Sequence, residues 1–179
     1  SRVICYHGEG AMDQGTFWQS LNFSALKKLP ILFVCENNNL AIYSEQRKRV
    51  KTLDICKKVE SFGVRTIKVE DNSTKNIFKY AQKALQRIEK NSQPIFLEIN
   101  TYREVDHVGI NYDFELGYRK KDKKQFVKNL NELNYLKEKT KNFLQVEKKI
   151  IKEISEALNY SYKSNFPKIK YIESNVTKE

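Results

Sequence analysis

Residues 3–38 read VICYHGEGAMDQGTFWQSLNFSALKKLPILFVCENN and contain two apolar runs with a helical pattern between them. Val3 to Tyr6 is expected to be a short buried strand, because the run is apolar and stops at a glycine turn. Thr16 to Lys28 carries apolar residues at spacings of three and four, which predicts a helix that Pro30 ends. Ile31 to Cys35 is continuously apolar, as strands covered on both faces tend to be. The stretch therefore predicts two parallel strands joined by a helical crossover.

The alternation of helices and strands continues as far as Tyr102. Apolar residues at helical spacing alternate with short apolar runs, and glycine, proline or a capping side chain stands between them. Such alternation predicts an α/β fold, a mostly parallel sheet with helices on both faces, which binds ligands at the carboxyl ends of its strands. The further expected elements are a helix near Thr52 to Phe62, a strand at Arg65 to Val69, a helix capped by Asn72 or Ser73, and a strand at Ile95 to Tyr102.

The domain organisation follows from a change of pattern near Arg103. Residues 1–119 are expected to form the α/β domain, which ends in a polar loop from Glu104 to Arg119 that is long enough to be functional. Residues 120–179 are expected to form a helical extension packed on the same domain, with an irregular tail from Ser164. We therefore expect one domain with an extension.

Composition excludes several classes of protein. The chain has 179 residues, of which 40% are hydrophobic, and a formal net charge of +11. No run approaches the roughly 20 apolar residues of a membrane-spanning helix, and no signal-peptide pattern is present, so we expect a cytoplasmic protein. Most of the positive excess lies between Lys120 and Glu179, where lysines alternate with apolar residues at helical spacing. A solvated helix face explains this charge, and nucleic-acid binding is not expected. Cys5, Cys35 and Cys56 show no metal or disulfide spacing and are expected to be buried free thiols.

Two polar motifs come together at one edge of the predicted sheet. Gly8-Glu9-Gly10 follows the first strand, and Asn37-Asn38 follows the second. Carboxylate and amide oxygens are hard donors that suit magnesium, which commonly binds phosphates with few protein ligands. Glycines let backbone N–H groups approach a diphosphate closely. The sequence therefore predicts a magnesium and diphosphate site at this edge.

The spacing of these motifs resembles a known family. G-E-G, then 26 residues from Ala11 to Glu36, then N-N is similar to the thiamine diphosphate motif. The whole stretch resembles the alpha subunits of pyruvate, branched-chain and acetoin dehydrogenases, and Thr101-Tyr102-Arg103 with His107 extends the likeness. The resemblance implies the thiamine diphosphate-binding fold, here N-terminally incomplete because the chain begins directly in a core strand.

The resemblance also implies the site residues. Magnesium would be held by Glu9, by the side chain of Asn38 and by the backbone carbonyl of Leu40. His107 would act in catalysis, in a loop that also contains Arg103. The residues expected to contact thiamine diphosphate are Gly8, Glu9, Gly10, Ala11, Asn38, Arg103 and His107.

The implied function is decarboxylation of a 2-oxo acid and transfer of an acyl or aldehyde unit to an acceptor, for which a lipoyl-bearing acyltransferase is one candidate. In the family this activity needs a beta subunit, so we expect an alpha2-beta2 assembly and no activity of the chain alone. Two alternatives stay open. One is a carbon-ligating synthase or transketolase-like half protein that uses the same cofactor, and the other is a truncated, noncatalytic module that only binds partners.

Several candidate residues also have a purely structural interpretation. Glu9 and Asn38 fit a polar turn with an Asx cap, and His107 fits an exposed loop histidine. His7 matches no ligand of the family and is more simply structural. Phe17 and Trp18 lie at helical spacing and are expected in the core. Two departures from the family stand out: Glu9 replaces the usual aspartate, and Val108 replaces a serine that is phosphorylated in mitochondrial relatives.

Overall fold

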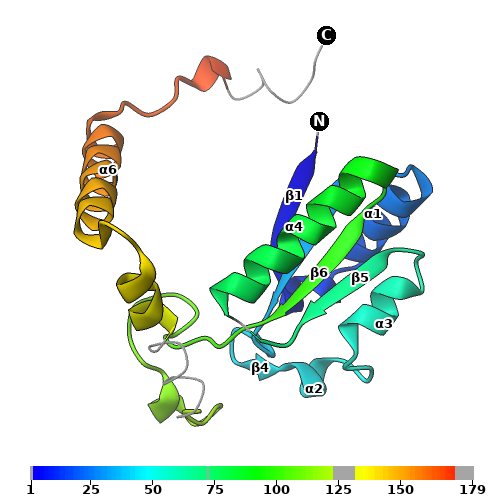
Figure 1. Cartoon of the computed structure of the whole chain (residues 1–179). Helices are drawn as coiled ribbons and strands as arrows, with labels where there is room; N and C mark the ends of the chain where they lie inside the picture. The colour runs from blue at the N-terminus through cyan, green and yellow to red at the C-terminus, as the bar shows by residue number, and fades with distance from the viewer. Residues whose placement is uncertain (1, 72, 123–131, 172–179) are drawn as a thin grey trace. The chain divides into compact units, whose positions relative to one another are not determined.

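The computed structural model describes residues 2–71, 73–122 and 132–171 (Figure 1). They divide into two compact units, Ser1–Glu132 and Leu133–Glu179. In the second unit, α6 (Phe143–Lys163) and the short η3 (Ile169–Tyr171) follow a helical stretch at residues 132–139. The expected packing of this helical extension on the α/β domain stays a prediction. No helix in the described ranges is long and apolar enough to cross a membrane.

The first unit is built on a four-stranded sheet in the order β1-β2-β6-β5. All three strand pairs are parallel, with Val34 opposite both Tyr6 and Leu97. The predicted parallel α/β architecture is therefore confirmed. The strands are β1 (Val3–Gly8), β2 (Ile31–Asn37), β5 (Arg65–Val69) and β6 (Ile95–Asn100).

Helices cover both faces of this sheet, as predicted (Figure 1). The core cluster on one face joins α1 (Gly15–Leu26) and α3 (Ile55–Glu60) to the sheet, and the cluster on the other joins α4 (Thr74–Asn91) to it. Successive residues of a strand point to opposite faces. Phe96 accordingly lies in the first cluster and Leu97 in the second.

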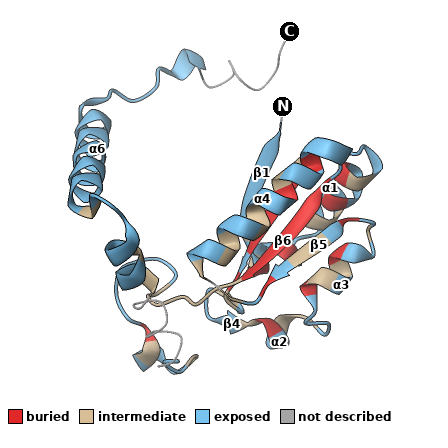
Figure 2. Ribbon diagram, viewed as in Figure 1, coloured by how far each residue is buried: buried red, intermediate tan, exposed pale blue. Residues whose placement is uncertain are grey.

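The first strand is not buried, which corrects the expectation for Val3 to Tyr6. Val3 and Tyr6 are 54% and 68% exposed, and Figure 2 shows β1 in pale blue, whereas the inner strand β6 is red. β1 is an edge strand that pairs only with β2 within the described chain, whereas α3 and α4 pack over β5 and β6 at the other side of the sheet. The expectation of a buried thiol is also wrong for Cys5, which is exposed on this edge strand, whereas Cys35 is buried and Cys56 half-buried.

Short elements at the carboxyl edge of the sheet were not predicted from the sequence. A 3-10 helix, η1, follows β1, and a small antiparallel hairpin, β3 with β4, follows β2. Together with the loop after β6, they place polar side chains above the strand ends. Their bounds are η1 (Glu9–Asp13), β3 (Leu40–Ala41), β4 (Ser44–Glu45), α2 (Gln46–Arg49) and η2 (Phe114–Leu116).

Candidate functional site

The two polar motifs lie side by side above β1 and β2. Gly8, the last residue of β1, is opposite Glu36 in the register of the sheet. A Cβ atom on Gly10 would lie 2.7 Å from the Cβ of Ala41, so only glycine allows η1 to approach the β3–β4 hairpin this closely. The structure thus brings Gly8, Glu9 and Gly10 next to the turn that carries Asn38 and Leu40.

Glu9 presents one buried carboxylate oxygen that has no protein partner. The residue is 3% exposed, and its Oε1 accepts a hydrogen bond of 2.7 Å from Nη2 of Arg49. Its Oε2 is buried and accepts no hydrogen bond within the described chain. Burial raises the pKa of Glu9, against the opposing charge of Arg49. Buried polar atoms without partners are rare in native proteins, and a hard cation is one partner that suits this oxygen.

Arg49 connects Glu9 and the rest of η1 to the β3–β4 hairpin. Its side chain is 14% exposed, and its Nη1 donates to a carboxylate oxygen of Asp13 in η1. Its Nε donates to the backbone carbonyl of Ser44 at 3.3 Å. The longer side chain of glutamate therefore has a structural partner here. Nothing in the local sequence pattern identified Arg49, which lies 40 positions from Glu9.

Asn38 lies in a turn that its own side chain closes. Its Oδ1 accepts a hydrogen bond of 2.9 Å from the backbone N–H of Leu40. This is the Asx turn that the structural interpretation of Asn38 predicts. An amide oxygen has two lone pairs, so one remains available to a cation. The next residue, Asn39, has a φ of 62° in the left-handed region, which asparagine tolerates better than most residues.

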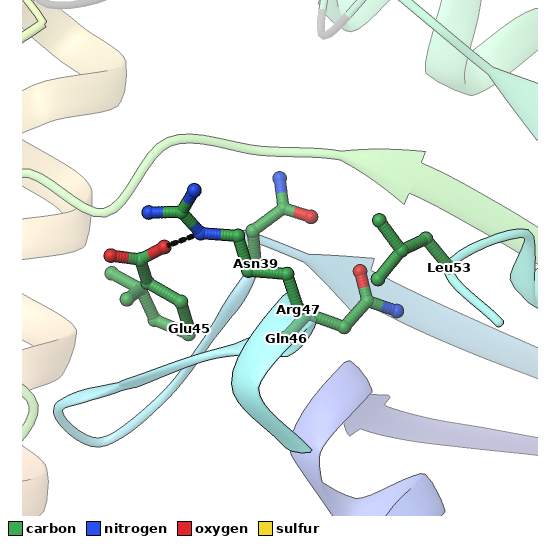
Figure 3. Close-up of a pocket in the computed structure, with 6 residues that line it drawn as sticks. Asn39, Glu45, Gln46, Arg47 and Leu53 are labelled. Atoms are coloured by element: carbon green, nitrogen blue, oxygen red, sulfur yellow. Dashed lines mark hydrogen bonds and ion pairs between the residues drawn. The ribbon is translucent and has the colours of Figure 1, made fainter. Parts of the chain in front are cut away.

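A cavity of about 330 Å³ opens beside this turn (Figure 3). Within it, Nε of Arg47 donates to a carboxylate oxygen of Glu45. The lining residues are Asn39, Leu40, Glu45, Gln46, Arg47 and Leu53.

A buried ion cluster holds the base of the loop after β6. Asp113 is 3% exposed and accepts hydrogen bonds from Nη2 of Arg103 at 3.2 Å, from Nε of Arg119 at 2.8 Å and from the hydroxyl of Tyr118. Nη1 of Arg103 also donates to the carbonyl of Ile42 at 2.9 Å, which ties this loop to the β3–β4 hairpin. Burial alone would raise the pKa of Asp113, but the hydrogen bonds and the two arginine charges lower it.

The sequence identified Arg103 but missed its partners. Asp113, Tyr118 and Arg119 lie in the polar stretch that was expected to be functional, yet their spacing matches no pattern of local structure. The arginine head group is engaged by protein acceptors, so its expected contact with the cofactor stays a prediction.

The two histidines lie in different environments. His107 is exposed on the loop after β6. His7 is half-buried, and its ring centroid lies 4.9 Å from that of Phe17 and 5.9 Å from that of Phe96. These contacts support the structural interpretation of His7. Phe17 and Trp18 pack against the core, as expected.

The acidic groups at this edge do not form a metal cage by themselves. Among residues 2–71, 73–122 and 132–171, no three His, Cys, Asp or Glu side chains converge in a way that could hold a metal ion. A cation at Glu9 must therefore take its other ligands from amide, carbonyl and ligand oxygens, as magnesium bound to a phosphate commonly does.

Comparison with known proteins gives a consistent result. The sequence model of the family described as "Dehydrogenase E1 component" matches residues 1–170. The pyruvate dehydrogenase E1 component subunit alpha of Porphyra purpurea is 35% identical over 105 residues, which cover 59% of this chain and 30% of the relative. That of Rickettsia bellii is 26% identical over 176 residues, which cover 92% and 52%. The 2-oxoisovalerate dehydrogenase subunit alpha of Bacillus subtilis is 29% identical over 156 residues, which cover 85% and 47%.

Solved structures agree on the fold. A transketolase variant from Pichia stipitis superposes with a TM-score of 0.50 at 16% identity, over 56% of this chain and 15% of the transketolase. This likeness concerns the fold alone. The chain spans about a third to a half of the length of the three curated relatives described above.

Proposed function

Because the chain belongs to the dehydrogenase E1 component family, we propose that it is the part of a 2-oxo acid dehydrogenase alpha subunit that binds the diphosphate of thiamine diphosphate through magnesium. The observation that carries the proposal is the buried, unpartnered Oε2 of Glu9 at the carboxyl edge of the sheet. Parallel sheets of this kind bind ligands at that edge.

The donor atoms available there fit a magnesium diphosphate. Glu9 offers one carboxylate oxygen, Asn38 the remaining lone pair of its Oδ1, and Leu40 its backbone carbonyl, which leaves coordination positions for diphosphate oxygens and water. In the first turn of a helix the N–H groups have no acceptor within the helix. The N–H groups of Gly10 and Ala11 are therefore the proposed backbone contacts to the diphosphate, and the absence of a side chain on Gly10 lets the turn come close.

The protein side of the reaction is positioning and proton handling. When bound, thiamine diphosphate supplies the bond-breaking chemistry of 2-oxo acid decarboxylation. Arg103 holds the following loop against the β3–β4 hairpin through its contact with Ile42. His107 is exposed on that loop, and histidine is the side chain that most often serves as a general acid or base. We therefore assign it the role of moving a proton or stabilising charge at the reacting group.

The proposal includes a beta-type partner, because the motifs supply a grip for the metal and diphosphate but no carboxylate to act at the other end of the cofactor. The expected assembly is alpha2-beta2, and a lipoyl-bearing acyltransferase is the proposed acceptor of the acyl unit. The test is to measure carbon dioxide release from 2-oxo acids by the protein alone, by its beta-type partner alone and by the two together, with a dye as electron acceptor.

Only the mixture is expected to decarboxylate a 2-oxo acid, and only with magnesium and thiamine diphosphate present. Omission of magnesium from the mixture is the internal control. Decarboxylation at enzymatic rates by the isolated chain would contradict the shared site, and a mixture that stays silent with every 2-oxo acid tried would contradict the proposed function.

Replacing His107 with alanine is expected to lower kcat by roughly 100-fold, because a positioned acid or base commonly contributes a factor of that order or more. Affinity for thiamine diphosphate should stay within about twofold, since the exposed imidazole is not among the proposed magnesium ligands and its loss removes one contact of the cofactor at most. Steady-state kinetics and calorimetry measure the two effects separately. Val108→Ala, at the neighbouring exposed position, is the matched control. A loss of cofactor affinity with unchanged kcat would show instead that His107 only anchors the cofactor.

A further inference from the structure

A carboxylate lies buried inside the sheet, away from the edge that binds the proposed cofactor. Glu98 is 2% exposed in the middle of β6, next to the fully buried Phe96 on the same face. Its Oε1 accepts a hydrogen bond of 2.8 Å from Nδ2 of Asn37, and its Oε2 accepts one of 3.1 Å from Sγ of Cys56. Burying a charge is costly, and an apolar side chain of similar volume is often at least as stable. A carboxylate at this position therefore calls for a role beyond packing.

The register of the sheet explains why Glu98 reaches Asn37. Glu98 is opposite Cys35, two residues before Asn37, so Asn37 and Glu98 are diagonal neighbours on one face of the sheet. On the other side of β6, Glu98 is opposite Lys68, whose charge interacts with it and which also pairs with Glu70 at 3.3 Å. The Asn37 bond is thus the contact that connects this buried charge to the polar edge.

The carboxylate determines which way the Asn37 amide points. An amide has a donor end and an acceptor end, whereas a carboxylate only accepts. Glu98 therefore takes the Nδ2 end and leaves Oδ1 to accept a hydrogen bond of 2.9 Å from the backbone N–H of Asn39. With the amide reversed, its NH₂ group would face that N–H, and its oxygen would face the carboxylate.

The turn beyond Asn37 is held at both ends. The carbonyl of Asn37 accepts from the N–H of Thr101 at 2.8 Å, and the carbonyl of Asn39 accepts from the N–H of Gln46 at 2.9 Å. Asn38 lies between these fixed residues, and its side chain closes the turn onto Leu40. The orientation of the Asn37 amide thus contributes directly to where Asn38 and the carbonyl of Leu40 lie.

We propose that Glu98 is a positioning residue for the cation-binding turn: from inside the sheet it orients the Asn37 amide and thereby sets the backbone on which Asn38 and Leu40 present their oxygens. Glu98 itself touches neither cofactor nor substrate. The inference rests on the proposed function, because it assigns a support to the same site.

The other contact of Glu98 supplies a matched control. Burial raises the pKa of Cys56 to about 12, so the thiol keeps its proton and remains a donor. Cys56 belongs to α3 and is linked to the Asn38 turn through its hydrogen bond to the carboxylate of Glu98. Cys56→Ala therefore removes one hydrogen bond from Glu98 and leaves the Asn37 bond in place.

The experiment measures the magnesium concentration needed for half-maximal binding of thiamine diphosphate, on the protein assembled with its beta-type partner. A hydrogen bond to a charged group is worth enough to change an equilibrium by roughly tenfold. Asn37→Asp puts two carboxylates in contact and is expected to raise the magnesium requirement by about that factor. Glu98→Gln leaves the amide orientation undetermined and is expected to raise it severalfold.

The double variant Asn37→Asp/Glu98→Gln exchanges donor and acceptor. Nε2 of the new glutamine can donate to the new aspartate, whose other oxygen can still accept from the N–H of Asn39. The magnesium requirement is expected to return to within about threefold of the wild type, since a restored pair recovers most of the lost interaction. Cys56→Ala is expected to lower the melting temperature in EDTA while it leaves the magnesium requirement within about twofold.

Each outcome decides the matter. If Glu98→Gln and Asn37→Asp need the same magnesium concentration as the wild type for half-maximal binding of thiamine diphosphate, the positioning role is overturned. The proposed function then stays intact. An effect of Cys56→Ala as large as that of Glu98→Gln, or a double variant that folds without recovery, also overturns it. Wild-type protein with no magnesium-dependent binding at all defeats the proposed function itself.

Discussion

Replacement of Asp113 by asparagine is expected to destabilise the loop between Thr101 and Arg119 by about 3 kcal/mol, the lower end of the range for breaking a buried ion pair. Asp113 is 3% exposed and accepts hydrogen bonds from two arginines. The amide that replaces it brings no charge, so two guanidinium groups would face each other across a buried space. The contact of Arg103 with Ile42 depends on the same cluster and should weaken with it.

Amide hydrogen exchange over residues 101–119 measures this effect directly. Glu115→Gln is the matched control, because Glu115 is an exposed carboxylate in the same loop. The measurement also has a pH dependence. The folded-state pKa of Asp113 lies below its ordinary value of 3.8, so its stabilisation is present above pH 3.8 and is lost as the pH falls through the folded-state pKa. Protection that is the same in Asp113→Asn and wild type at neutral pH would show that the cluster does not hold the loop.

Local sequence pattern predicted the positions of the strands well, and it did so most directly for β2, which is a short, buried apolar run. The strand Arg65 to Val69 has the predicted bounds, and β2 extends the predicted run by two residues to Asn37. Exposure of β1 could not be predicted in the same way. Its apolar residues look like those of an inner strand, and only the order of strands in the sheet places it at an edge.

Only some residues of the candidate site could be predicted from the sequence. The motifs around Glu9 and Asn38 could be found from the sequence, because the chemistry of a metal and diphosphate restricts residue types within a few positions. The residues that hold these motifs in place could not be found in this way. Arg49 pairs with Glu9 across 40 positions, and Glu98 pairs with Asn37 across 61. Side-chain contacts of this range depend on the register of the sheet and the course of its connections, which no local periodicity contains.

Replacement of Asn38 by alanine is expected to have the largest effect on the proposed site. It removes one of the three proposed protein ligands of magnesium, and even the loss of residues that only support a ligand typically weakens metal binding by 10- to 100-fold. We expect affinity for thiamine diphosphate at saturating magnesium to fall by roughly 100-fold. Loss of the Asx-turn hydrogen bond to Leu40 adds a stability cost of about 1 kcal/mol.

Two variants separate the ligand from the turn. Asn38→Asp keeps an oxygen for both the cation and the N–H of Leu40, so cofactor affinity should be largely retained. Asn39→Gly removes the neighbouring side chain without backbone strain, because the φ of Asn39 is 62° and glycine adopts this conformation freely. Equal losses in Asn38→Ala and Asn39→Gly would attribute the effect to the turn rather than to a ligand.

Calorimetric titration of thiamine diphosphate into the assembled protein, with magnesium and with EDTA, is the measurement that tests the site most directly. We expect the wild type to bind only with magnesium, Asn38→Asp and Asn39→Gly to retain this binding, and Asn38→Ala to lose roughly 100-fold in affinity. Binding by the wild type that is equally tight in EDTA, or equal affinity of Asn38→Ala and wild type with magnesium, would contradict the proposed site.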